Sequence, residues 1–76
     1  MIDLHHVHLF ASDIDETLDW WKRHMRARIL FDDVLAGARN VFVAIGTGRL
    51  HIYDQPPRDT GRGGVHHIGL RVKDLR

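Results

Sequence analysis

The opening phrase of this chain returns at its end. Residues 4–14 read LHHVHLFASDI, and residues 65–75 read VHHIGLRVKDL, at a constant offset of 61 (65 minus 4). The identical pairs are His5/His66, His6/His67, Leu9/Leu70 and Asp13/Asp74. Such self-similarity predicts two structural units of one kind. The second unit is only begun, so we expect its remainder to be missing or to be supplied by a partner chain.

The sequence of the first unit predicts a strand followed by a helix. Residues 4–11 alternate between two faces, which predicts a strand. Ile14, Leu18, Trp21 and Met25 form one stripe at helical spacing, so a helix is expected over about 13–25. Ser12 is the expected N-cap, with Asp15 as its capping-box partner.

Three further strands are predicted before a linker. Ala36–Ala38 and Gly46–Gly48 have the composition of tight hairpin turns. Residues 55–64 hold two prolines and three glycines and no apolar run, which is typical of a linker. The predicted strands are Arg28–Leu35, Asn40–Ile45, Arg49–Asp54 and, after the linker, Val65–Val72.

Composition and charge exclude several classes of protein. The chain has 76 residues, a formal net charge of +1 and no cysteine. This charge is too small to favour nucleic acid or an acidic membrane surface as a partner. No disulfide framework or thiolate metal site is possible, and neither a signal peptide nor a membrane span is recognisable. We therefore expect a cytoplasmic protein without nucleic-acid or membrane partners, and the seven histidines suggest metal chemistry.

The strand patterns bring three histidines to one face. Val7 and Leu9 are expected to face the helix, which leaves His6 on the opposite, concave face. By the same alternation His67 and His51 lie on that face. Three imidazoles suit a divalent first-row ion such as zinc, iron, nickel or cobalt, whereas manganese prefers more oxygen ligands. The alternative is that His51 is an ordinary polar strand residue.

Other candidate residues rank below this set. His8 is expected on the concave face, where it would touch a ligand or orient a metal ligand. His5 and His66 are expected on the wrong face, and His24 at the helix end. Possible pocket residues are Phe10, Tyr53, Arg49 and Arg71, for which ordinary packing or solvated rim charges are the alternatives.

Three segments of the chain resemble the vicinal oxygen chelate superfamily, which includes glyoxalase I, methylmalonyl-CoA epimerase, extradiol dioxygenases and bleomycin-binding proteins. They are LHHVHLFASDIDETLDWWKRHM, GARNVFVAIGTGRLHIYDQP and GGVHHIGLRVKDL. The resemblance implies an α+β fold in which paired strand-helix-strand-strand-strand modules curl into a cup around one divalent metal (Zn, Ni, Fe, Co or Mn). Residues 1–54 would be the first module, 55–64 the linker, and 65–76 the first strand of an incomplete second module.

The resemblance also implies metal ligands. The family's ligand positions fall on His6, His51 and His67, with histidine at position 51 where glyoxalases and epimerases carry glutamate or glutamine. The fourth ligand, a glutamate late in the second module that helps move a proton in isomerases, has no counterpart here. Lyase, isomerase and dioxygenase chemistry on a small oxygen-chelating substrate all remain open.

Two other functions compete with a metal-dependent homodimeric enzyme. One is a metal-free binding or resistance protein of the bleomycin-binding type, against which the histidine triplet argues. The other is a non-catalytic chain whose last strand exchanges into a partner.

Overall fold

The computed structural model describes residues 2–56 and 67–73. These described residues form one helix and four strands in the order strand, helix, strand, strand, strand, which confirms the predicted α+β module. The elements are β1 (Val7–Ala11), α1 (Ile14–Met25), β2 (Arg28–Leu35), β3 (Ala38–Ile45) and β4 (Gly48–Asp54).

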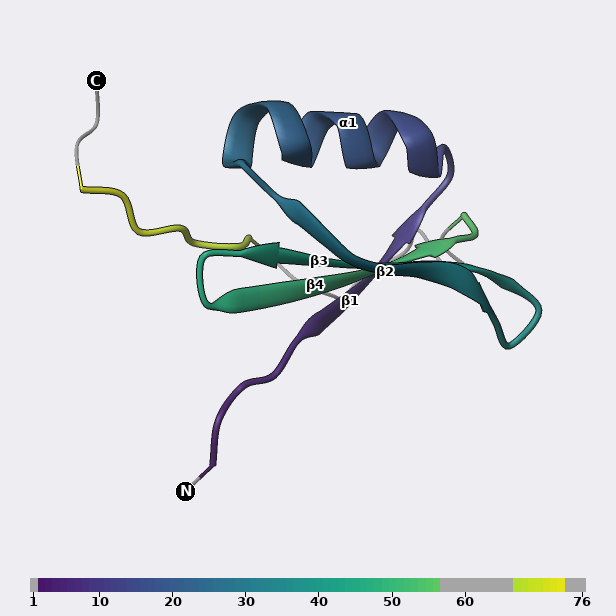
Figure 1. Ribbon diagram of the computed structural model, residues 1–76, viewed down its shortest axis with the longest axis horizontal. Coiled ribbons are helices and arrows are strands. Elements are labelled where there is room, and N and C mark those ends of the chain that lie inside the picture. Colours follow the sequence, from purple (N-terminus) through teal and green to yellow (C-terminus); the bar gives the residue numbers. More distant parts are fainter. Residues whose placement is uncertain (1, 57–66, 74–76) are drawn as a thin grey trace.

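The four strands form one mixed sheet with the order β1-β4-β3-β2. β1 pairs with β4 in parallel, and the two hairpins β2–β3 and β3–β4 are antiparallel. The helix lies over one face of this sheet, while the described residues leave the other face without a covering layer (Figure 1). We call these two surfaces the covered face and the open face.

Local sequence explains where α1 begins and ends. Asp13, rather than Ser12, is the N-cap, because its side chain accepts a hydrogen bond from the Glu16 N–H at 3.1 Å. Asp15 and Glu16 lie in the first turn, and three basic residues lie in the last, so both ends complement the helix dipole. The helix stops at Arg26, whose φ of 54° is left-handed.

The core lies between α1 and the covered face. Ile14 and Leu18 of the helix are buried against β-branched and aliphatic side chains of the two central strands. These sheet residues are Val41, Val43, Leu50 and Ile52. Their alternation along β3 and β4 places every second side chain under the helix.

The β2–β3 turn contains two residues with positive φ. Ala36 has a φ of 53° and Gly37 a φ of 83°, as a two-residue hairpin turn of this twist requires. The Asn40 side-chain amide donates to the carbonyls of Leu35 and Ala38, and Tyr53 Oη donates to the Ala36 carbonyl at 3.0 Å. The turn is therefore held by side chains from β3 and β4.

Two predicted strands differ from the structure by more than two residues. The first begins at Val7 rather than at residue 4, so the alternation of faces does not extend to His5 and His6. Residues 67–72 of the predicted Val65–Val72 strand adopt no strand. Val65, His66 and the linker beyond residue 56 lie outside the described residues.

Within the described part, no helix has the length and apolar character needed to cross a membrane.

Candidate metal centre

An aromatic row crosses the open face of the sheet. Phe31 stacks on its cross-strand neighbour Phe42, with ring centroids 4.8 Å apart. Phe42 in turn stacks on His51, its partner in β4, at 3.7 Å and 14° between ring planes. Offset or stacked rings add stabilisation beyond their buried area. The row therefore fixes the imidazole of His51 against the sheet.

His51 is enclosed on both of its ring faces. The His6 ring stacks on the side away from Phe42, with centroids 3.6 Å apart and planes at 14°. Only 7% of His51 is exposed, and its Nε2 atom is buried without a hydrogen-bond partner. A buried polar atom without a partner costs roughly 1–3 kcal/mol, so this nitrogen is a position where a ligand would relieve a penalty.

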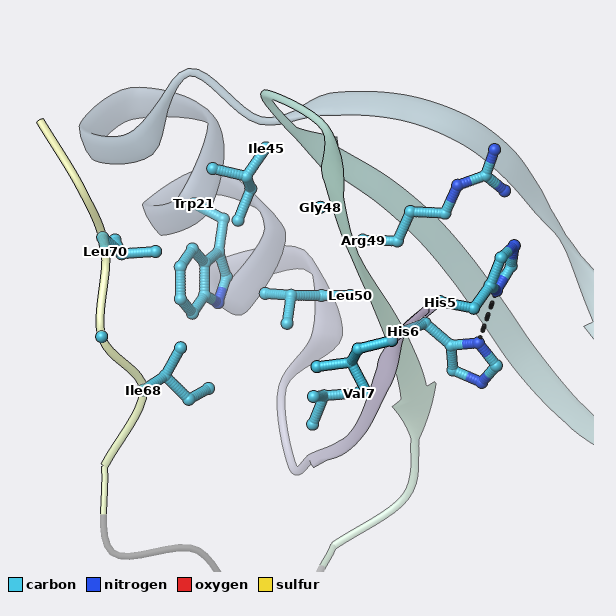
Figure 2. A pocket seen from close by; sticks show the side chains of 12 residues that line it. His5, His6, Val7, Trp21, Ile45, Gly48, Arg49, Leu50, Ile68 and Leu70 are labelled. Carbon is cyan, nitrogen blue, oxygen red and sulfur yellow. Dashed lines mark hydrogen bonds between the residues drawn. The ribbon is translucent and has the colours of Figure 1, made fainter. Parts of the chain in front are cut away.

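Three histidines bring their nitrogen atoms together at this point. His5, His6 and His51 each offer one donor atom, and these atoms lie within 4.8 Å of one another. The Nδ1 atoms of His5 and His6 form a 2.8 Å hydrogen bond (Figure 2). His5 and His6 come from the segment before β1 and are exposed, whereas His51 is buried in β4.

The surroundings keep His51 uncharged. Burial, and after it the charges of the neighbouring His6, His8, His5 and Arg49, lowers the pKa of His51 from 6.5 to about 4. At neutral pH this imidazole is therefore unprotonated, the form in which histidine binds a metal ion.

The remaining residues predicted on the open face border this cluster. The His8 ring lies 6.0 Å from that of His51 and 5.7 Å from that of Tyr53, edge to face in both cases. Phe10 contacts Tyr53 in the same way at 6.2 Å and is 48% exposed. These side chains form a wall beside the histidines.

His67 and Arg71 lie in the C-terminal segment, residues 67–73, and this segment contacts the edge of the covered side. Ile68 and Leu70 line a pocket of about 210 Å³ together with Trp21 and Leu50. Figure 2 shows these four side chains on one side of the strands, and His5 and His6 on the other. The group of converging donors contains no nitrogen of His67.

His5 was expected on the helix side, and this expectation is wrong. Its ring reaches both His6 and His51, because residues 2–6 do not pair in the sheet and strand alternation does not apply to them. The doubled His-His in the sequence was the available signal, since adjacent imidazoles outside a strand can turn to the same side.

The donor set suits a divalent ion of the zinc, nickel or cobalt type. Its ligands are neutral imidazoles, one of them buried with an unsatisfied nitrogen. The stacked rings of His6 and His51 cannot both direct in-plane lone pairs at one point. Binding therefore requires His6 to turn, which its exposure permits.

Comparison with known proteins gives a consistent picture. The sequence profile described as Glyoxalase/Bleomycin resistance protein/Dioxygenase superfamily matches residues 3–76. The crystal structure of methylmalonyl-CoA epimerase from Mycobacterium tuberculosis superposes with a TM-score of 0.61 at 18% identity. The match covers 66% of this chain and 36% of the epimerase chain. The crystal structure of SMU.1112c gives a TM-score of 0.67 at 19% identity, covering 99% of this chain and 68% of the other.

No sequence among the curated proteins matches this chain. At the identities found, the two solved structures support the fold alone. The matched part of this chain spans little more than a third of the epimerase's length.

Proposed function

Because the chain belongs to the Glyoxalase/Bleomycin resistance protein/Dioxygenase superfamily, we propose that it is a metal-dependent enzyme of the glyoxalase-like type. Its divalent ion is held on the open face by His6, His51 and a third imidazole, for which the family's motif implies His67. The substrate is a small molecule that offers two neighbouring oxygen atoms. The observation that carries this proposal is the buried, unpartnered Nε2 of His51 beside further imidazoles.

A bound divalent ion supplies Lewis acidity, which polarises substrate oxygens and stabilises negative charge that develops on them. The residues of this chain prepare the site for that chemistry. Phe42 holds the His51 ring by stacking, so that its orientation is set before any ligand arrives. The low pKa of His51 keeps its lone pair available at neutral pH.

The open face also bears on assembly. Phe10 is 48% exposed on this face, beside Tyr53 and the histidines. We propose that two copies of the chain come together so that their open faces form one cup. A homodimer would bring two such modules together, one from each chain.

The experiment that tests the proposed function measures metal content and solution mass on one sample purified without chelator. We expect at least one zinc, nickel, cobalt or iron ion per cup in a particle of twice the chain mass. A preparation that carries no ion and takes up none of these metals on addition would refute the metal-dependent function.

A metal-free binding protein is the second candidate. The row of Phe31, Phe42 and His51 favours it. Because these rings pack face to face on one another, their edges are left to contact the face of a flat apolar molecule. Under this function, removing metal with a chelator would leave small-molecule binding unchanged. Under the proposed function, chelation would abolish turnover.

A further inference from the structure

Two histidines compete for the third place beside His6 and His51. The sequence repeat and the family motif favour His67, which is equivalent to His6 in the second unit. The structure instead brings His5 into the group of donors within 4.8 Å. If His5 is the third ligand, residues of the first module alone provide all three imidazoles. If His67 is the third ligand, the site also needs the segment that follows the linker.

The position of His5 has a simple backbone cause. Successive residues of a strand point to opposite faces, so His5 and His6 would diverge if β1 extended to them. β1 begins at Val7, and the two imidazoles instead meet through their Nδ1 atoms at 2.8 Å. Their rings stand at 83° to each other with centroids 5.1 Å apart.

His5 also reaches the buried histidine. Its ring centroid lies 6.0 Å from that of His51, edge to face at 85°. Zinc bonds of about 2.0–2.1 Å would place nitrogen ligands about 3.4 Å apart, so the present group needs a shortening of its longest separations together with a turn of the His6 ring. His5 and His6 are both exposed and can make that movement, while Phe42 holds His51 in place.

We propose that His5 is the third imidazole ligand, so that one chain forms a His5–His6–His51 site without His67. This inference rests on the proposed function and names its ligand set. No carboxylate belongs to the group among the described residues, so the site offers neutral nitrogen donors only. Imidazole sets favour zinc, cobalt, nickel and copper over magnesium, calcium and manganese, which prefer oxygen.

The test is calorimetric titration of the full-length chain with Zn²⁺ at pH 7.5. It compares the unsubstituted protein with His5→Ala and His67→Ala, and uses His24→Ala in the helix as the matched control. All three side chains are exposed or lie outside the core, so far-UV circular dichroism should show the same fold for each variant. Because even the loss of a residue that only orients a ligand costs metal affinity about 10–100-fold, His5→Ala should weaken zinc binding about tenfold or more.

We expect His67→Ala and His24→Ala to bind zinc within about twofold of the unsubstituted chain, one ion per chain, with binding retained in excess Mg²⁺. Weakening by His67→Ala, with His5→Ala unaffected, would overturn the inference and leave the proposed metal function standing. A failure of the unsubstituted chain to bind zinc, cobalt or nickel would overturn both.

Discussion

The same strands place different kinds of side chain on the two faces of the sheet. β4 alternates Leu50 and Ile52 on the covered face with His51 and Tyr53 on the open face. The covered face is aliphatic, and Ile52 is fully buried beneath the helix. The open face is built from rings, and its buried histidine lacks a hydrogen-bond partner.

Within β4, the residues that stabilise the fold therefore lie on one face and the proposed functional residue lies on the other. Aliphatic side chains under the helix satisfy all that packing requires, since they contain no polar atoms to leave unpaired. His51 is as buried as its neighbours but retains an unsatisfied nitrogen. Features that reduce stability without structural compensation are expected at functional sites.

The largest effect should come from the covered face. Ile52→Ala removes a side chain with 0% exposure and leaves a cavity, which costs about 3 kcal/mol. A domain of this size has a free energy of unfolding of roughly 5 kcal/mol, so most of the stability should disappear. Urea unfolding followed by circular dichroism measures the change.

The control for this prediction is Val34→Ala in β2, where the side chain is 63% exposed. A surface truncation of this kind should change the free energy of unfolding by no more than about 0.5 kcal/mol. Equal effects of the two substitutions would show that the helix does not form the main core with β4.

His51→Phe sharpens the comparison from the open face. The new ring keeps the stack with Phe42 and removes the unpartnered nitrogen, so the metal-free chain should gain about 1 kcal/mol in unfolding free energy. Zinc binding, measured by the same titration as above, should be lost. A less stable variant that still binds zinc would contradict the separation of the two faces.

The smallest effect concerns the ion pairs at the margin of the covered face. Arg39 donates to Asp32 at 2.8 and 2.9 Å and to Asp15 at 2.9 Å, linking β3 to β2 and to α1. The hydrogen bond from Arg39 holds the pKa of Asp32 below its ordinary value of 3.8. These groups are at least a third exposed, so Arg39→Met should cost only about 0.5–1 kcal/mol at neutral pH.

The pH dependence of that cost follows from the sign of the shift. A carboxyl group with a depressed pKa in the folded state stabilises it above the unfolded value and loses this contribution as pH falls through the folded value. The stability difference between the unsubstituted chain and Arg39→Met should therefore be constant above about pH 5 and shrink below pH 3.8. A difference that persists unchanged at pH 2.5 would mean that Arg39 acts through packing of its alkyl stem.

Much of the fold could be predicted because its signals are local. The apolar stripe from Ile14 to Met25 predicted α1, and the glycine turns placed the hairpins within two residues of their observed bounds. The prediction of Ser12 as the N-cap was wrong. Ser12 and Asp13 are both good capping residues, and only the backbone conformation decides between them.

The site was predicted less completely. His6, His8 and His51 were expected on one face, and the structure brings their rings within contact distance. His5 was missed because strand alternation was extended past the point where β1 begins. The role of His67 stays a prediction, to be decided by the zinc titration.

The sequence by itself determined the module, because hydrophobic periodicity and turn residues act over a few neighbours in the chain. It also determined which residue types stand on β4, and therefore that imidazole rather than carboxylate faces the open side. Only the tertiary structure decided which imidazoles meet. The start of β1 and the stacking of His51 between Phe42 and His6 depend on pairing between strands far apart in the chain, which no local pattern encodes.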